Sequence, residues 1–278
     1  MLTSATTISP EHCVNAIEFL AAIGVLISTL ELTATRSLFA VHGLLSWQVM
    51  QTHFAWTTRL PLARVLSTIF TGRGFTTLLA VRAFAAAALL LPYRMDITSA
   101  VATAAVVSTG LLLCLRSPYG LDGSDQMLTV IMAALFCYEI APERGLLRVV
   151  ALWFIAAQAC MAYFSSGFAK LLSSEWRTGK AISGVLGTAN YGNRVVHSFM
   201  VGRPHWCCVA AWTVIVFEIT FSVVLFMPSH PLRILFLAVG GTFHITTALV
   251  MGLNTFFWAF VATYPAVIYT ALEFNGPH

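Results

Sequence analysis

Long runs of apolar residues separated by short polar turns fill almost the whole 278-residue chain. A helix needs about 20 predominantly apolar residues to cross a bilayer. The pattern therefore predicts an all-α fold: a polytopic integral membrane helix bundle of about eight transmembrane helices, forming a single domain over residues 1–278. The runs interpreted as spans are Val14–Thr33, Phe75–Pro92, Ile97–Leu115, Gln126–Ile140, Leu147–Leu172, Trp206–Met227 and Leu232–Leu272, the last read as two helices broken at Gly252–Asn254.

Two stretches do not have the pattern of a clean span. Between Arg36 and Gly74, tryptophans alternate with arginines, which is typical of an interfacial helix and loop; the alternative is a span over Leu38–Trp56. The stretch Ser173–Pro204 is rich in glycine and asparagine. We expect its apolar piece, Ala181–Ala189, to lie on the membrane or to re-enter it, and non-helical backbone at that depth needs a cavity or protein cover.

Composition removes the soluble alternatives. Hydrophobic residues make up 58% and charged residues 9% of the chain, whereas soluble domains carry about 25% charged residues. We therefore expect a multi-pass protein of the cell membrane, with the lipid bilayer as its environment. The net charge of +4 comes from Lys and Arg in loops, which is a topology signal, so no nucleic-acid partner is predicted. The six cysteines form no CxxC pair, and no metal site is predicted.

Three ionisable residues lie near the middle of predicted spans, where a charge costs roughly 2.5–3.5 kcal/mol on the mildest scale. They are Arg82, Glu218 and His244. Arg82 and Glu218 are either a pair that neutralise each other and lock two helices, or charges that line a buried polar cavity. His244 is either a neutral imidazole that is hydrogen-bonded across helices, or part of the same cavity.

A fourth ionisable residue, Lys170, lies near the end of the predicted span Leu147–Leu172. At 100° per residue, Tyr163, Ser166, Gly167 and Lys170 share one helix face. Snorkelling of Lys170 to the interface does not require a phenol and a glycine on that face. A lysine shielded from water loses its proton more easily, and a neutral amine is a competent general base. The face therefore favours the wall of a polar cavity that contains a base.

The stretch Tyr163-Phe-Ser-Ser-Gly167-Phe-Ala-Lys170-Leu, followed by Trp176 and Gly179, resembles the signature of the HTTM (horizontally transferred transmembrane) family. This family is related to the membrane region of vitamin K-dependent gamma-carboxylase. The resemblance extends in order through Gly43-Leu-Leu-Ser-Trp47, Arg116-Ser-Pro-Tyr-Gly-Leu-Asp122-Gly-Ser-Asp125-Gln126, Phe217-Glu218 and Phe243-His244.

The resemblance implies that Lys170 is the base that deprotonates a vitamin K hydroquinone-like cofactor. In the carboxylase, oxygen then converts the cofactor into a base strong enough to remove a proton from a glutamate γ-carbon. Here the spacing from Lys170 to Trp176 is one residue longer, and the chain ends at His278 without the carboxylase's further domain. We therefore expect a reduced quinone or another lipid-soluble small substrate, rather than carboxylation of glutamate.

The expected function is that of a carboxylase-related or quinone-linked membrane enzyme, of lyase or oxidoreductase type. Resemblance to small bacterial members places it in the maturation of a secreted peptide or small metabolite, with a peptide or a companion membrane protein as partner. The alternatives are a non-catalytic scaffold or immunity-type partner of a peptide-modification or export system and, ranked last, a small transporter. The predicted catalytic residues are Lys170, His244 and Glu218, and the predicted cofactor-binding residues are Tyr163, Gly167, Trp176 and Arg82.

Overall fold

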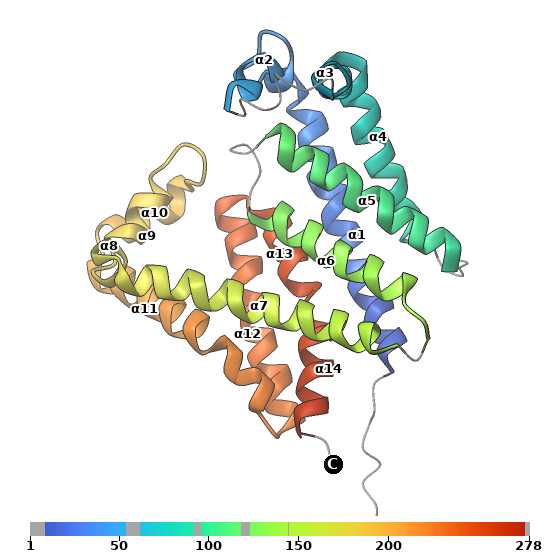
Figure 1. Ribbon diagram of the computed structural model, residues 1–278. Helices are drawn as coiled ribbons and strands as arrows, with labels where there is room; N and C mark the ends of the chain where they lie inside the picture. The colour runs from blue at the N-terminus through green and yellow to red at the C-terminus, as the bar shows by residue number, and fades with distance from the viewer. Residues whose placement is uncertain (1–8, 54–61, 92–95, 118–122, 144, 276–278) are drawn as a thin grey trace, which may run out of the picture. The chain divides into compact units, whose positions relative to one another are not determined.

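The computed structural model describes residues 9–53, 62–91, 96–117, 123–143 and 145–275. All regular structure within these ranges is helical (Figure 1). The chain divides into two compact units: residues 18–151 form one, and residues 1–17 together with 152–278 form the other. The prediction of a single domain over the whole chain stays a prediction.

Six helices in the described residues are long and apolar enough to cross a membrane. They are Pro10–Ala34, Ile97–Arg116, Leu146–Leu172, Pro204–Phe226, His230–Met251 and Asn254–Asn275. Two further predicted spans form the shorter helices α4 (Gly72–Ala88, 17 residues) and α6 (Gly123–Ile140, 18 residues). At 1.5 Å per residue these measure about 25–27 Å, against a hydrocarbon core of about 30 Å. The predicted number of about eight spans is therefore supported for six.

In the unit of residues 18–151, α5 (Asp96–Arg116) packs against both α4 and α6. The unit also contains most of α1 (Pro10–Ala34), the start of α7 (Leu146–Leu172) and four short helices. The short helices are η1 (Arg36–Phe39), α2 (Trp47–Met50), η2 (Gln51–His53) and α3 (Leu62–Phe70). Residues 36–53 form short helices instead of one long helix, and the rest of the alternative span Leu38–Trp56 lies outside the described residues. The interfacial position of this segment stays a prediction.

An aromatic cluster in this unit surrounds Arg116, whose side chain is fully buried. Its guanidinium donates hydrogen bonds to the carbonyl oxygens of Phe39, Leu45 and Phe70, at 3.1, 3.3 and 3.2 Å. It also lies over the rings of Phe39 and Phe75, at 4.7 and 4.4 Å from their centroids. The arginine therefore ties the short helices to the end of α5.

The second unit contains most of α7 and the chain that follows it. Its further helices are α8 (Ser174–Arg177), α9 (Lys180–Leu186), α10 (Arg194–Val201), α11 (Pro204–Thr220), η3 (Phe221–Phe226), α12 (His230–Met251), α13 (Asn254–Val261) and α14 (Tyr264–Asn275). The stretch Ala181–Ala189, expected to lie on or re-enter the membrane, forms most of α9 and the turn after it.

Local sequence signals explain several of these helix ends. Gly252, at φ +74°, ends α12 and donates its backbone N–H to the carbonyl of Ala248, because glycine tolerates the left-handed conformation of a helix C-terminus. The Asn193 side chain accepts hydrogen bonds from the N–H groups of Val195 and Val196 at the start of α10, as is typical of an asparagine at a helix N-terminus. Because α12 ends at Met251 and α13 begins at Asn254, the break predicted at Gly252–Asn254 is confirmed.

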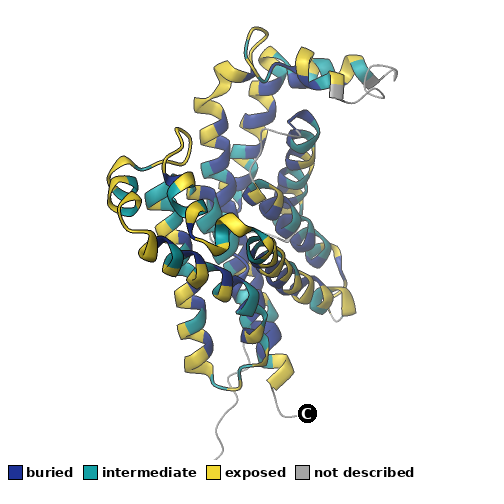
Figure 2. Cartoon of the chain, turned by 90° about the vertical axis from the view of Figure 1, so that its left-hand side faces the viewer, coloured by how far each residue is buried: buried dark blue, intermediate teal, exposed yellow. Residues whose placement is uncertain are grey.

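Large apolar side chains are exposed along the long helices, and Figure 2 shows exposed positions on the helices as well as in the turns. Phe168 on α7, Val216 on α11 and Leu249 on α12 expose 46%, 53% and 79% of their surface. Helices that present apolar side chains outward at this density are stable where the surroundings are lipid. This is the arrangement expected of an integral membrane protein.

Candidate active site

The polar face predicted on α7 is present in the structure. Tyr163, Ser166, Gly167 and Lys170 all belong to α7, which ends at Leu172. Tyr163 is 2% exposed, and the Lys170 side chain is 17% exposed. Lys170 therefore lies at the partly accessible end of a face that is closed at Tyr163.

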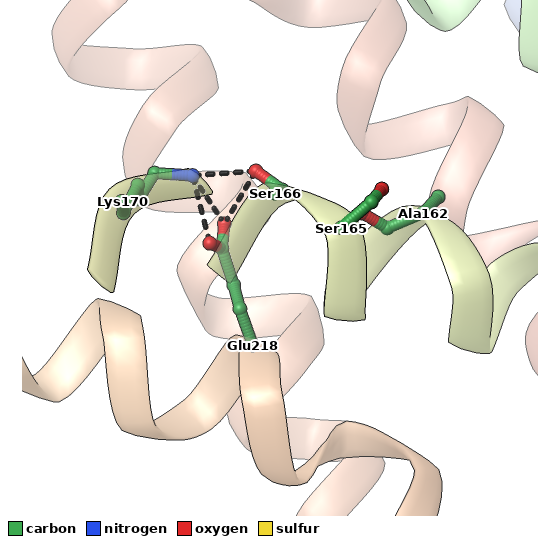
Figure 3. Close-up of polar contacts among 5 residues, drawn as sticks. All are labelled: Ala162, Ser165, Ser166, Lys170 and Glu218. Atoms are coloured by element: carbon green, nitrogen blue, oxygen red, sulfur yellow. Dashed lines mark hydrogen bonds and ion pairs between the residues drawn. The ribbon is translucent and has the colours of Figure 1, made fainter. Parts of the chain in front are cut away.

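Lys170 forms an ion pair with Glu218 of α11 (Figure 3). Its Nζ lies 2.7 Å from Oε2 and 3.0 Å from Oε1 of Glu218, and 2.5 Å from the hydroxyl of Ser166 one turn back along α7. Nζ thus has three acceptor oxygens, one for each N–H of an ammonium group. The Ser166 hydroxyl in turn donates to Glu218 Oε1 at 3.4 Å.

Gly167 allows α7 and α11 to approach closely beside this pair. A Cβ atom added at Gly167 would lie 2.8 Å from the Cβ of Glu218 and 2.9 Å from the backbone nitrogen of Ile219. Both distances are shorter than real Cβ contacts, and the second involves backbone that cannot rotate away. The absence of a side chain at Gly167 is therefore required for Glu218 to lie where it meets Lys170.

Trp176 covers Lys170 from the short helix that follows α7. The Nζ atom lies 5.1 Å from the centroid of the Trp176 ring, within the range of a cation–π interaction. The Trp212 indole donates to the carbonyl of Arg177 at 3.2 Å and so attaches α8 to α11. Gly179, at φ +79°, packs directly on the backbone of Cys207 and Cys208. The turn after Lys170 is therefore fixed to α11 at two points.

His244 belongs to a second cluster, which meets α7 at Tyr163, about two turns before Lys170. The Tyr163 hydroxyl is hydrogen-bonded to His244 Nε2 at 2.7 Å and to the Tyr264 hydroxyl at 3.1 Å. The ring of Phe260 stacks on the imidazole at 4.5 Å and 17°, and Phe221 stacks on Tyr163 at 3.9 Å. A hydrogen bond from His244 to another helix, one of the two interpretations of this residue, is present, and its partner comes from α7.

Six of the seven predicted site residues therefore lie in one unit, in two clusters joined through α7. The seventh, Arg82, lies on α4 in the other unit, where it is 1% exposed and its Nε and Nη1 have no hydrogen-bond partner among the described residues. Glu218 receives its compensating charge from Lys170, so pairing with Arg82 is not needed to explain its burial.

Tyr264 is the member of these clusters that the sequence reasoning missed. It lies within the apolar run 254–272 next to Pro265, where a tyrosine is indistinguishable from an interfacial anchor. The one local signal is Gly240, one turn before His244: a Cβ there would lie 2.5 Å from the Tyr264 hydroxyl. Within the described residues, no group of three or more His, Cys, Asp or Glu side chains is placed to hold a metal ion.

The Lys170–Glu218 pair can exchange a proton with a bound hydroxyl group. The pair has no net charge either as ammonium and carboxylate or as amine and carboxylic acid. In both forms it can accept one further proton, because the amine or the carboxylate offers a free lone pair. All three N–H groups of an ammonium at Nζ are already directed to oxygens, so the carboxylate is an integral part of any base at this position.

Comparison with known proteins identifies one region of the chain. Residues 144–271 match the family model described as HTTM domain. The matched region contains Lys170, Glu218, Tyr163, His244 and Tyr264. The resemblance expected from the lysine motif is therefore confirmed for this region. Neither the curated proteins nor the solved structures include a match to the chain.

Proposed function

We propose that this membrane protein, with its HTTM domain over residues 144–271, is an enzyme that uses the Lys170–Glu218 pair as a general base toward a lipid-soluble hydroxyl compound. The observation that carries the proposal is the pair itself: a lysine and a carboxylate in contact at 2.7 Å, on apolar helices, with the lysine side chain 17% exposed. Buried acid–base pairs at partly open positions are characteristic of sites of proton transfer.

The substrate class follows from the surroundings of the pair. Trp176 lies against Lys170 and Tyr163 is packed among phenylalanine rings, so an aromatic ring system is better accommodated than a sugar or a free amino acid. A reduced quinone fits this donor set, because its acidic hydroxyl group suits a lysine–carboxylate base. When bound, it would supply the reducing equivalents of a carboxylase-like or oxidoreductase reaction. Lys170, Glu218 and Trp176 are the residues that would hold it.

Each residue then has a defined role. The proton of the substrate hydroxyl passes to the pair and is shared between Nζ and the Glu218 carboxylate, leaving the substrate oxygen negatively charged. Ser166 holds Nζ toward Glu218, and Trp176 excludes water from one side of the amine. Gly167 sets the distance between the two helices. His244 polarises the substrate from the neighbouring cluster.

The test is quinol-dependent oxygen consumption by membranes that contain the protein, with menadiol as the probe. Lys170→Met is the test variant, and Lys180→Met, the chain's other lysine and an exposed residue of α9, is the matched control. We expect Lys180→Met to retain the wild-type rate and Lys170→Met to lose it. Equal rates in the two variants would remove Lys170 from the mechanism.

A non-catalytic scaffold is the second candidate, because the same ion pair and the Gly167 contact lock α7 to α11. A scaffold predicts that Lys170→Met lowers thermal stability and assembly with its partner, while no chemical step is lost. The enzyme proposal predicts loss of turnover in protein that remains folded. Measuring the melting temperature and the rate on the same preparations separates the two.

A further inference from the structure

We infer that Tyr264 is a positioning residue that, through Tyr163, makes His244 present its Nδ1–H as a hydrogen-bond donor to a carbonyl or phenolate oxygen of the ligand. This inference names the role of one group in the site and rests on the proposed function. Three side chains form a hydrogen-bonded series in the order Tyr264, Tyr163 and His244.

The first step concerns which nitrogen of His244 is free. Nε2 is occupied by the Tyr163 hydroxyl at 2.7 Å. Phe260 covers a face of the imidazole, stacked at 17°, and the ring of Phe243 meets it edge-on at 5.0 Å. The remaining polar atom is Nδ1, so a ligand that meets His244 meets it there.

The second step concerns the direction of the hydrogen bonds. If Tyr264 donates to Tyr163, and Tyr163 donates to Nε2, both hydroxyl protons have an acceptor, and the donor left over is the Nδ1–H of His244. Nδ1 is not among the fully buried polar atoms that lack a partner in the described residues, so this proton is open to a ligand or to water. In the reverse direction, Nε2–H donates to Tyr163 and Tyr163 donates to Tyr264, which leaves the Tyr264 proton without an acceptor among the contacts that this hydroxyl makes in the described residues. A buried donor without an acceptor is costly. The first direction is therefore the stable one.

The third step follows from the chemistry of imidazole. A neutral imidazole carries one proton, and an Nε2 that accepts a hydrogen bond leaves that proton on Nδ1. His244 then acts toward the ligand as a donor, not as a base. Within the proposed reaction such a donor stabilises the negative charge that develops when the Lys170–Glu218 pair removes a proton from a hydroxyl of the same ligand.

Tyr264 enters because its hydroxyl fixes the direction. Without its proton, the oxygen of Tyr163 has no donor, and Nε2–H can donate to it instead. Tyr264→Phe removes only this hydroxyl and keeps the ring that packs near Phe221. Tyr269→Phe is the matched control, because Tyr269 is another buried tyrosine of α14.

The first experiment is nitrogen NMR of ¹⁵N-histidine-labelled protein in lipid membranes, with His244→Gln used to assign the His244 signals. We expect Nδ1 protonated and Nε2 unprotonated in the wild type and in Tyr269→Phe, and a second population with protonated Nε2 in Tyr264→Phe. A wild-type His244 that is protonated on Nε2, or on both nitrogens, overturns the inference whether or not the protein turns over menadiol.

The second experiment is the menadiol assay. We expect Tyr264→Phe to lower kcat about fivefold to tenfold, the effect of one misdirected hydrogen bond, with little change in KM, and Tyr269→Phe to match the wild type. An unchanged kcat in Tyr264→Phe, in protein whose NMR shows the altered tautomer, refutes the catalytic part of the inference. Absence of menadiol turnover in the wild type argues against the proposed function, and the tautomer result is then judged on the NMR alone.

Discussion

Arg116 and Lys170 are two cations at the ends of long apolar helices, and the protein binds them in opposite ways. Arg116 is fully buried and donates to three backbone carbonyls between two phenylalanine rings. Lys170 is 17% exposed and meets a carboxylate and a hydroxyl. Neutral carbonyls cannot exchange a proton with a guanidinium, which stays charged in proteins, whereas a lysine and a carboxylate can share one.

The partners of the two cations distinguish a structural role for Arg116 from a candidate chemical role for Lys170. A guanidinium with a rigid fork of donors is suited to collecting backbone carbonyls from several segments. A lysine that is paired with a carboxylate and has a partly exposed side chain can still be reached by a substrate. Burial alone would have ranked Arg116 above Lys170 as a site residue.

The largest expected effect is the loss of turnover in Glu218→Gln. Glutamine keeps the size of the side chain but cannot hold a proton, so a base made of both groups should fail as completely as it does in Lys170→Met. We expect the rate of menadiol-dependent oxygen consumption to fall by about 10²–10⁴-fold, the range for general acid–base catalysis. A rate within tenfold of the wild type would show that Lys170 acts without Glu218.

Arg116→Met should reduce stability instead of chemistry. It leaves the carbonyls of Phe39, Leu45 and Phe70 without their donor, and each buried unsatisfied group costs about 1–3 kcal/mol. We expect the free energy of unfolding, measured in mixed detergent micelles, to fall by roughly 3–5 kcal/mol. Arg148→Met is the control, because within the described residues Arg148 donates to one carbonyl, that of Ala141, and lies over one ring, that of Tyr138. Equal losses in the two variants would contradict the structural role of Arg116.

Removing one partner of the ion pair should cost more stability than removing both. Glu218→Gln leaves the Lys170 charge without a counter-charge. The double variant, Lys170→Met with Glu218→Gln, has no charge at either position. We expect a coupling free energy of about 1–3 kcal/mol in a double-mutant cycle of thermal or denaturant unfolding. A coupling near zero would mean that the contact is too well solvated to organise the helices.

Gly167→Ala tests whether helix spacing controls the pair. The added Cβ overlaps Glu218 and the backbone of Ile219, and overpacking of this kind costs about 1–3 kcal/mol. Gly241→Ala on α12 is the control, since a Cβ there meets nothing within 4 Å. We expect a lower melting temperature and a rate about tenfold lower for Gly167→Ala alone. A variant that is destabilised but fully active would separate the spacing of the helices from the function of the pair.

The sequence predicted the long helices well, because apolar runs of 20 or more residues have few other stable structures. The sequence was less decisive for α4 and α6, which contain the polar residues Arg82 and Asp125. Hydropathy predicts that both segments are helical but does not decide whether they cross the bilayer. The chain break at Gly252 was predictable because glycine can adopt the left-handed conformation found there.

The site was predictable as a set of unusual residues but not as a set of contacts. Charges within apolar runs pointed to Glu218 and His244, and helix periodicity placed Tyr163 with Lys170. Which cation compensates Glu218 could not be predicted, because Arg82 and Lys170 are equally plausible from spacing alone. Tyr264 was not predictable, since its role comes from a contact between residues 101 positions apart, and a tyrosine in an apolar run has no distinguishing pattern.

Trp176→Leu should have the smallest effect of the series. The cation–π contact with Lys170 Nζ, at 5.1 Å, is worth about 0.5–1 kcal/mol at a partly exposed position, while the ion pair and the Ser166 contact remain. We therefore expect a twofold to fivefold loss of rate and little change in melting temperature. Trp206→Leu, which replaces an exposed tryptophan of α11, is the control. A loss as large as that of Glu218→Gln would mean that Trp176 contacts the substrate and defines its binding site, in addition to covering the lysine.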